Sequence, residues 1–444
     1  MDGVPSWTWS YDGWVMLGGV LCAVAASLPG NFLVLRRMSL LGDAVSHAVL
    51  PGLAMAFWIT NSRSGLPVYV GAVTTGLITA MLTQWIRDVG KVDEGASIGV
   101  AFTTLFAAGL VLMSQAAPAV DLDPGCVLYG ILEASPLDTV ALAGLEIPRI
   151  VLTLSLVLII NLAFVVLMFK ELLISSFDPG LATTEGCSAQ LMHYLLMVIV
   201  AITTVASFEA TGNILVVAML IVPPSIALLL TDRLSRMIMI SAAAAAFSAV
   251  LGDAAAVTVP RWFGFRSTSS AGMMTVCAGL LFLLAGLFAP SRGLVAVWLR
   301  HQRLALRILA EDTIALMYRL DERGAEGPVQ AGFLARRLLS STFPTWLVLQ
   351  RQRLRGWVAA ELAGYRLTIA GRQAASALVR SHRLWETYLV NEGVDAGVIH
   401  RQAEVLEHFT GRALREKLRA EGPTSERDPH GSVIPDEDPG AARP

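Results

Sequence analysis

Nine apolar stretches of membrane-spanning length limit what the first two thirds of the chain can fold into. They lie at about 13–35, 40–59, 67–86, 95–115, 150–169, 190–207, 212–231, 235–257 and 270–289. Each is close to the ~20 residues that a helix needs to cross the hydrocarbon core of a bilayer. The sequence therefore predicts an all-α polytopic membrane protein with about 8–9 transmembrane helices.

Charged residues are divided unevenly along the 444 positions. Only 15% of the chain is charged and 55% is apolar, whereas an average soluble protein is about 25% charged and roughly 45–50% apolar. The first 290 positions hold 28 Asp, Glu, Lys or Arg residues, and the last 154 hold 40. This division predicts a transmembrane domain over 1–295 and a soluble domain that begins near residue 300.

The overall charge and the cysteines exclude several other classes of function. A formal net charge of −2 gives no global attraction for nucleic acid. The cysteines are scattered, at Cys22, Cys126, Cys187 and Cys277. No pair has the spacing of a metal or redox motif, which argues against a disulfide framework or a zinc knuckle.

Basic residues between the apolar segments predict the orientation in the membrane. They occupy every second loop, at Arg36, Arg37, Arg87, Lys91, Lys170, Arg233 and Arg236. Cytoplasmic loops are enriched in Lys and Arg, so these loops are predicted to be cytoplasmic. The amino terminus is then external, and the soluble carboxyl-terminal domain is cytoplasmic.

The pattern after residue 300 is that of soluble helices with one hairpin. We expect an amphipathic helix over 304–322, two helices within 328–357, a hairpin over 358–368, and helices near 371–391 and 398–420. This order is typical of a winged helix followed by packed helices. It predicts a cytoplasmic α+β region made of a degenerate winged-helix-like domain at 300–370 and metal-binding or dimerisation helices at 371–420. The Pro-, Gly- and charge-rich segment 421–444 is predicted to be disordered.

One pair of ionisable residues lies inside the second apolar segment, in the run GDAVSHAVLPG. Asp43 and His47 are four positions apart, so a helix places both side chains on one face. A carboxylate beside a neutral imidazole suits a borderline divalent ion such as manganese, iron or zinc. The alternative is a salt bridge at a helix end. Ionisable groups within membrane segments also serve proton-transfer or structural roles.

A short capped helix is predicted in the loop FDPGLATTEG. Asp178 before Pro179 has the residue order of an N-cap followed by a proline in the first turn, and Gly186 can end the helix. The local sequence leaves open whether this is an ordinary surface helix or a docking element. The chain itself lacks an ATP-binding loop of the form G-x-x-x-x-G-K-[ST], because its only lysines are Lys91, Lys170 and Lys417.

Histidine and glutamate recur at helical spacing in the soluble region. One stripe has the spacing i, i+4, i+7 and i+8, and a second pair is four residues apart: His400, Glu404, Glu407 and His408, then His382 and Glu386. Such nitrogen and oxygen ligands could hold a divalent metal. The alternative is a solvated helix face.

Several motifs of the membrane region together resemble the permease of manganese, zinc and iron ABC importers. These are RRMSLLGDAVSHAVLPGLA, DEGASIGVAF, DLDPGCVLYGIL, FDPGLATTEG and GNILVVAMLIVPPSIALLL, in this order within about 10–290. The resemblance implies that Asp43 and His47 line the metal pathway. It also implies a coupling loop that docks on a separate ATPase through Phe177, Asp178, Pro179, Ala182 and Gly186.

The same resemblance implies further partners and a location. Such importers pair two permease subunits, as a homodimer or heterodimer, with an ABC ATPase and an extracytoplasmic metal-binding protein. They lie in the bacterial cytoplasmic (inner) membrane. The permease is not itself an enzyme and binds no nucleotide.

The soluble region resembles iron- and manganese-dependent repressors related to the diphtheria toxin repressor. The motifs are VRSHRLWETYLV, IHRQAEVLEH and DPHGSVIP, and the similarity covers about 310–435. The resemblance assigns ligand roles to seven positions: Asp312, His382, Glu386, His400, Glu404, Glu407 and His408. Glu404 replaces a cysteine of iron-type members, which favours manganese, whereas Ala315 replaces a second ligand of the amino-terminal helix.

Three hypotheses follow from the sequence. The first is a transmembrane subunit of an ATP-driven importer of manganese, zinc or iron, with a carboxyl-terminal metal-sensing domain. The second is a membrane-tethered, metal-dependent transcription regulator. The segment STFPTWLVLQRQRLRGW is too apolar for a typical recognition helix, so DNA is not an expected partner. The third is a remnant dimerisation module that binds no metal.

Overall fold

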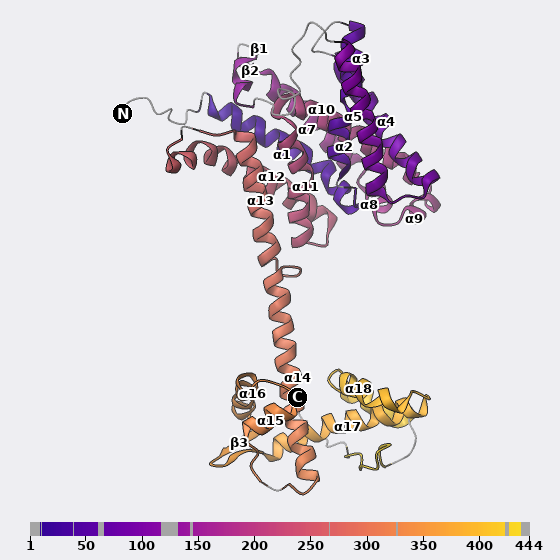
Figure 1. Ribbon diagram of the computed structural model, residues 1–444, viewed down its shortest axis with the longest axis vertical. Coiled ribbons are helices and arrows are strands. Elements are labelled where there is room, and N and C mark those ends of the chain that lie inside the picture. Colours follow the sequence, from indigo (N-terminus) through magenta and orange to yellow (C-terminus); the bar gives the residue numbers. More distant parts are fainter. Residues whose placement is uncertain are drawn as a thin grey trace. The chain divides into compact units, whose positions relative to one another are not determined.

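The computed structural model divides the chain into two units, Met1–Ala296 and Val297–Pro444. We call them the membrane unit and the C-terminal unit and describe each by itself (Figure 1). The structure describes residues 9, 11–38, 40–60, 66–116, 132–142, 145–265, 267–325, 327–421 and 426–436. Most of the DLDPGCVLYGIL motif lies outside these residues.

The membrane unit is almost entirely helical. Its helices are α1 (Asp12–Leu35), α2 (Leu40–Ala48), α3 (Leu50–Thr60), α4 (Leu66–Gly90), α5 (Glu94–Ala116), α7 (Arg149–Leu167), α8 (Phe169–Phe177), α9 (Pro179–Thr184), α10 (Ala189–Thr211), α11 (Asn213–Leu230), α12 (Leu234–Thr258) and α13 (Ser270–Phe288). Two 3-10 turns, η1 (Leu132–Leu137) and η2 (Pro260–Phe263), and a hairpin of β1 (Thr139–Leu142) and β2 (Leu145–Pro148) complete it. The sequence did not predict this hairpin.

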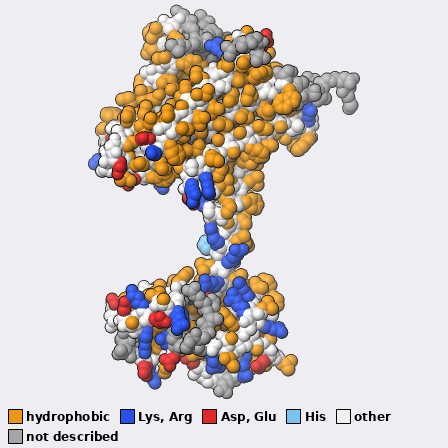
Figure 2. All heavy atoms as spheres, turned by 180° about the vertical axis from the view of Figure 1, so that it is seen from behind, with side chains coloured by type: hydrophobic (Ala, Val, Ile, Leu, Met, Phe, Trp, Pro, Cys, Tyr) orange, Lys and Arg blue, Asp and Glu red, His pale blue; other side chains and the backbone are white. Residues whose placement is uncertain are grey.

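Eight membrane-spanning candidates are present among the described residues, in agreement with the predicted polytopic fold. They match eight of the nine predicted segments, and α4, with 25 residues, covers the remaining one. The predicted segment 40–59 is divided into α2 and α3 at Val49, two residues before Pro51. Figure 2 shows hydrophobic side chains over most of the visible face of this unit.

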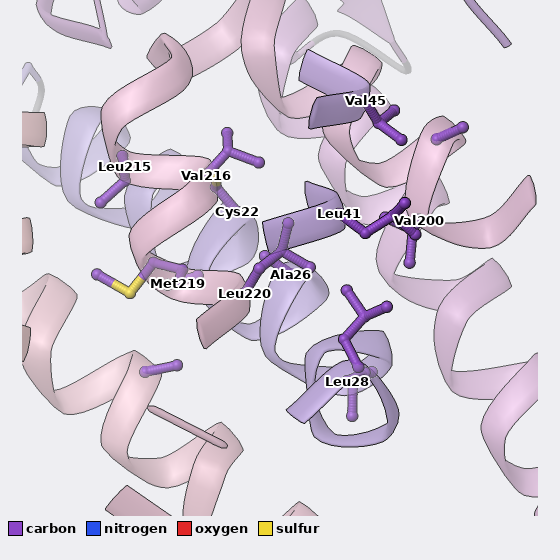
Figure 3. Packing of buried hydrophobic residues seen from close by; sticks show 14 of the residues in the cluster. Cys22, Ala26, Leu28, Leu41, Val45, Val200, Leu215, Val216, Met219 and Leu220 are labelled. Carbon is purple, nitrogen blue, oxygen red and sulfur yellow. The ribbon is translucent and has the colours of Figure 1, made fainter. Parts of the chain in front are cut away.

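The core of the membrane unit lies around α1, which packs against α7, α10, α11 and α12. Figure 3 shows buried residues of α1, α2, α10 and α11 directed toward one another, among them Ala26, Leu41, Val200 and Leu220. Polar side chains in this core bond to neighbouring helices. Asn31 Nδ2 donates to Ser241 Oγ at 2.8 Å, and Asn161 Nδ2 lies 2.8 Å from the Ala25 carbonyl. Such partners are needed where no water can supply a hydrogen bond.

Glycine allows two of these helix pairs to approach at backbone distance. A Cβ added at Gly30 would lie 2.1 Å from the Leu220 carbonyl oxygen, and one added at Gly252 would lie 2.2 Å from Met274 Cα. Small residues at helix contacts are characteristic of membrane bundles, because dispersion contacts replace the hydrophobic effect there.

The C-terminal unit forms the predicted winged-helix arrangement followed by three helices. Its elements are α14 (Leu294–Glu322), α15 (Ala331–Arg337), α16 (Thr342–Leu354), β3 (Val358–Glu361), β4 (Gly364–Leu367), α17 (Ile369–Asn391), α18 (Ala396–Glu407) and α19 (Arg412–Glu421). The single helix expected near 398–420 is two helices, because the chain turns at 408–411. A small core joins α14, α15, α16, the hairpin and α17 around Ile314, Leu334 and Leu349.

The segment after α19 differs from its predicted disorder. Residues 426–436 form a turn with a bridge between Arg427 and Val433, and Ile434 is buried against Leu384 and Leu418. The composition predicts solvation, but ion pairs from α17 and this apolar contact hold the segment. Arg383 Nε lies 3.5 Å from Asp428 Oδ2.

The close contact at Gly30 leads to a stability prediction. Gly30→Ala would push its methyl group into the backbone of α11, and overpacking of this kind costs about 1–3 kcal/mol. We expect a lower unfolding temperature for the purified chain in detergent. Gly279→Ala in α13 is the matched control, because no atom lies within 4 Å of its added Cβ. Equal melting temperatures for the two variants would contradict the packing described for α1 and α11.

Candidate metal sites

The predicted pair in the second apolar segment meets on one face of α2. Asp43 Oδ1 lies 3.4 Å from His47 Nε2, and both side chains are partly exposed. The i, i+4 spacing on a helix accounts for this approach. The prediction that Asp43 and His47 share one face is confirmed. Their role in transport stays a prediction.

Asn213 is a third polar group at this position that the sequence reasoning missed. It opens α11, and its Nδ2 lies 3.4 Å from His47 Nε2. Asn213 is buried, and its Oδ1 has no hydrogen-bond partner among the described residues. The sequence feature that could have indicated Asn213 is a polar residue at the start of a strongly apolar span. Carboxylate, imidazole and an unpaired amide oxygen thus meet from two helices 166 positions apart.

Aromatic rings cover the other side of His47. The centroids of Phe102 and Phe106, both in α5, lie 6.1 and 5.7 Å from that of the imidazole. These rings limit the orientations of the imidazole. The cluster therefore presents a small polar point with an apolar wall, which is suited to transient contact with a cation.

His193 of α10 lines a separate cavity of about 500 Å³ in the membrane unit. Arg36 and Arg87 also line it, and Arg36 donates to Ser175 Oγ at 2.9 Å and to Ser176 Oγ at 3.1 Å. Asp88 is the one carboxylate in this lining, and two guanidinium groups outweigh its charge. The lining therefore does not favour a cation.

The predicted short helix in the FDPGLATTEG loop is present as α9. Asp178 Oδ1 accepts from the Leu181 backbone N–H at 2.9 Å, Pro179 occupies the first turn, and Gly186 has φ +85°. Ala182 is buried and anchors the helix, whereas Phe177 is 64% exposed. The predicted cap and stop are confirmed. An exposed aromatic next to a rigid turn leaves an apolar surface available to a partner.

In the C-terminal unit, the structure brings His382, Glu386 and His400 together. His382 Nε2 lies 3.1 Å from Glu386 Oε1, and His400 Nδ1 lies 2.8 Å from the same oxygen. His382 and Glu386 are buried, and His400 is exposed. We call this group the α17 cluster. Its ligand atoms lie within 4.8 Å of one another, close enough to hold one metal ion.

A second group joins α14 to the end of α18. Asp312, Glu407 and His408 also place ligand atoms within 4.8 Å of one another, and we call them the α14 cluster. His408 Nε2 lies 3.3 Å from Asp312 Oδ1, and its Nδ1 lies 2.7 Å from Glu311 Oε2. Glu311 is a buried carboxylate that sequence reasoning missed. Because Glu311 directly precedes Asp312, the sequence places it on the same helix, but it does not predict that the side chain meets His408.

The remaining predicted ligand does not join either cluster. Glu404 is exposed on α18 and lies outside both groups. The stripe of four residues on α18 is thus divided, with His400 facing the α17 cluster and Glu407 and His408 facing the α14 cluster.

Unpaired buried atoms indicate that these residues fit a cation. His382 Nδ1 and Glu407 Oε2 lie 2.6 Å apart yet lack hydrogen-bond geometry. Buried polar atoms of folded proteins are otherwise nearly always bonded. Two clusters with such atoms, imidazole nitrogens and carboxylate oxygens have the donor set of a divalent transition-metal site.

The face of α16 does not resemble a DNA-reading surface. Phe343 and Trp346 stack with their centroids 6.3 Å apart, and both side chains are exposed. Base edges are read by polar and basic side chains, and phosphates by basic ones. Arg351 and Arg353 lie in the last turn of α16, away from its first, apolar turns.

Comparison with known proteins finds one family model in each part of the chain. Residues 12–289 match the model of the ABC 3 transport family. Residues 368–436 match the iron dependent repressor, metal binding and dimerisation domain.

Several of the relatives are named as manganese transport proteins, and one, TroD of Treponema pallidum, as a zinc transport system membrane protein that is 38% identical over 281 residues, 63% of this chain and 75% of that protein. The manganese transport system membrane protein MntD of Bacillus subtilis is 42% identical over 292 residues, which cover 66% of this chain and 96% of that protein. MntC of the same organism is also a manganese transport system membrane protein. It is 28% identical over 412 residues, which cover 91% of this chain and 90% of MntC. Among solved structures, PsaBC from Streptococcus pneumoniae is similar, with 30% identity and a TM-score of 0.52. The match covers 63% of this chain and 92% of the PsaBC chain.

Without metal, both clusters are held by shared protons. Burial acts to lower the pKa of His382, but the carboxylates of Glu386 and Glu407 beside its two ring nitrogens outweigh it and raise that pKa to about 9. Burial also acts to lower the pKa of His408, and contacts with Asp312 and Glu311 raise it to about 10. His382 and His408 are therefore protonated at neutral pH, and metal binding must release these protons.

This protonation predicts a pH-dependent stability of the metal-free C-terminal unit. The pKa of His382 is raised from 6.5 to about 9, so its contribution is complete below about pH 6.5 and is lost as the pH rises through 9. Hydrogen exchange of α17 and α18 in the chelator-treated full chain, corrected for intrinsic rates, should show falling protection from pH 6.5 to 9. Amides of α1 are the internal control. Constant or rising protection in α17 would contradict the charged His382 described above.

Proposed function

Because the chain belongs to the ABC 3 transport family, we propose that it is the membrane-spanning subunit of an ATP-driven importer of manganese, zinc or iron. The observation that carries this proposal is the meeting of Asp43, His47 and Asn213 inside a bundle of membrane-spanning helices. Manganese transport by the relatives MntD and MntC supports the substrate class.

The three side chains would form a transient binding point for the ion in its pathway. Asp43 supplies negative charge, His47 supplies a nitrogen ligand, and the unpaired Oδ1 of Asn213 supplies a neutral oxygen. Borderline divalent ions accept such a mixed set, and the small number of ligands keeps the ion exchangeable. Because polar groups in a membrane interior are costly, their placement here favours a transport role over a structural one.

ATP hydrolysis would come from a partner chain. The sequence lacks a phosphate-binding loop, and the turn from α8 into α9 offers a rigid, partly apolar docking surface with Phe177 and Leu181 exposed. We infer that an ABC ATPase docks on this loop, that a second permease subunit completes the pathway, and that an extracytoplasmic protein delivers the ion. The chain would lie in the bacterial cytoplasmic membrane, with the C-terminal unit in the cytoplasm.

The C-terminal unit would sense cytoplasmic metal. The α14 cluster provides Asp312, Glu407 and His408, an oxygen-rich set that suits manganese. Ala315 provides no ligand, but Glu311 beside His408 adds a second carboxylate from α14. A bound ion would neutralise these carboxylates and replace the protons on the imidazoles. We infer that occupancy of the unit lowers transport when cytoplasmic metal is plentiful.

The alternative of a membrane-tethered transcription regulator receives less support. The winged-helix elements are present, but the exposed first turns of α16 carry Phe343 and Trp346 where base-reading side chains would stand. An exposed apolar face of this kind is more typical of contact with another protein surface.

The pathway assignment predicts the loss of metal uptake in a double variant. Asp43→Ala with His47→Ala removes the charge and the nitrogen ligand, so ATP-dependent uptake of 54Mn²⁺ or 65Zn²⁺ into vesicles holding the assembled importer should fall by about 100-fold. Loss of an outer-shell group alone costs roughly 10–100-fold. Glu404→Ala, an exposed residue outside both clusters, is the control. Unchanged uptake by a correctly assembled double variant would refute the assignment.

The sensing assignment predicts that damage to the C-terminal unit relieves inhibition. Deletion of 300–444, or His408→Ala in the full chain, should raise manganese uptake into vesicles preloaded with manganese, because the α14 cluster no longer holds the ion. His301→Ala, an exposed histidine of α14 outside both clusters, should behave as the wild-type chain. Uptake that stays equal in all four proteins at high internal metal would exclude feedback by this unit.

A further inference from the structure

The cavity that His193 lines in the membrane unit contains a half-buried cation that has only neutral partners. Arg36 directly follows α1, and it donates from Nη2 to Ser175 Oγ at 2.9 Å and from Nε to Ser176 Oγ at 3.1 Å. Among the described residues, Arg36 forms no ion pair with a carboxylate. Burial lowers the pKa of its guanidinium, as expected for a cation removed from water. A partly buried charge without a counterion is costly, so an anion beside Arg36 would be stabilising.

The lining of this cavity supplies further hydrogen-bond donors. The volume of about 500 Å³ lies within the roughly 300–1,000 Å³ that is typical of ligand pockets. Arg87 of α4 adds a second guanidinium, and the side chains of Gln190, His193 and Tyr194 in α10 can each donate a hydrogen bond. Gln190 also lies in the first turn of α10, where the helix dipole favours negative charge. The cavity is therefore rich in groups that bind anions.

One carboxylate, that of Asp88, is present in the same lining. Its side chain is 61% exposed, and Gln84 Nε2 donates to its two oxygens at 3.0 and 2.9 Å. Arg87 Nε lies 4.0 Å from Asp88 Oδ1. Asp88 thus partly balances the charge of Arg87 and leaves that of Arg36 unmatched, so the lining as a whole stays positive.

The place of the cavity in the bundle indicates the class of anion. It lies where α1 and α4 end and α10 begins, at the ends of membrane-spanning helices. The planar fork of a guanidinium matches the oxygens of a phosphate group, and basic pockets between membrane helices bind lipid headgroups. Trp85, next to Gln84, is 62% exposed, and Leu191, next to Gln190, is 54% exposed. Apolar side chains therefore flank the polar lining along both α4 and α10.

We propose that the cavity beside Arg36 and Arg87 is a binding site for a phosphate group, carried by an acidic phospholipid or present as free phosphate. Exposed Trp85 and Leu191 favour the lipid, because they offer its acyl chains an apolar surface. The proposed orientation of the chain puts this end of the helices at the cytoplasmic leaflet, whose acidic lipids attract basic groups. Ser175 and Ser176 form the last turn of α8 directly before the FDPGLATTEG loop. A phosphate group held by Arg36 therefore stabilises the base of that loop.

The test is lipid binding by the purified full chain in detergent, measured by native mass spectrometry. The probes are dioctanoyl phosphatidylglycerol, which is anionic, and dioctanoyl phosphatidylcholine, whose added cation the two arginines repel. The wild-type chain should bind phosphatidylglycerol about 10-fold more tightly, roughly the effect of one hydrogen bond to a charged group. Arg36→Gln and Arg87→Gln should each remove this preference. Arg236→Gln is the matched control, because Arg236 is exposed in another loop that is predicted to be cytoplasmic and lies outside the lining.

A thermal measurement separates loss of binding from loss of folding. Phosphatidylglycerol should raise the unfolding temperature of the wild-type chain and of Arg236→Gln, because a ligand stabilises the folded state that binds it. It should leave the unfolding temperature of Arg36→Gln unchanged, while a cooperative transition shows that this variant is folded. Arg36→Lys keeps the charge and should regain part of the shift. If Arg36→Gln has no such transition, Arg87→Gln decides the result.

A competition with inorganic phosphate identifies the source of the phosphate group. Displacement of phosphatidylglycerol by phosphate, with an equal rise in unfolding temperature, would assign free phosphate to the site, and continued lipid binding would assign the phospholipid. Equal binding of phosphatidylglycerol by the wild-type chain and both arginine variants would overturn the proposal. The same holds if the wild-type chain binds the two lipids equally and does not respond to phosphate. The binding test requires no transport, so loss of the proposed metal pathway would not change its result.

Discussion

The absence of water from the bilayer core is the constraint on which the membrane unit depends. A polar group there must find its partner within the protein, so the backbone is helical and Asn31 and Asn161 bond across helices. Helices that gain little from hydrophobic burial must also approach closely, which Gly30 allows against Leu220. Against this background, an amide oxygen without a hydrogen bond at Asn213 gains meaning from its place beside Asp43 and His47. The same constraint that orders the bundle thus marks the place where a cation can replace the missing partner.

The C-terminal unit solves a different problem, because it has little apolar surface to bury. Much of its order comes from α17, which contributes to three separate apolar clusters through Ala375, Leu378 and Leu384. The same helix presents His382, Arg383 and Glu386 to other segments. A change in the charge of the α17 cluster therefore acts on the helix that supports the packing of the whole unit. This connection gives metal binding a physical route to the stability of the domain.

The sequence was most informative where a contact is local. Apolar length predicted the spans, the i, i+4 spacing predicted the meeting of Asp43 and His47, and residue order predicted the cap at Asp178. It failed where the contact depends on tertiary structure. Asn213 reaches His47 from 166 positions away, and the order of 426–436 depends on Arg383. The residues of the α18 stripe are divided between two clusters because α18 packs with different residues directed at different neighbours. A periodic pattern shows which residues share a helix face but not which neighbour each of them meets.

The two metal clusters share a buried carboxylate and are therefore not independent. Glu407 belongs to the α14 cluster, yet its Oε2 lies 2.6 Å from His382 Nδ1 of the α17 cluster, with Arg319 at 3.8 Å. A buried carboxylate is costly without a partner, so a change of charge on either side alters the balance on the other. In the proposed function, a cation bound near Asp312 would compete with His382 for Glu407, and a cation held by His382 would displace the proton that Glu407 stabilises. Through this one side chain, the unit would respond to the combination of ions present and not to each ion separately.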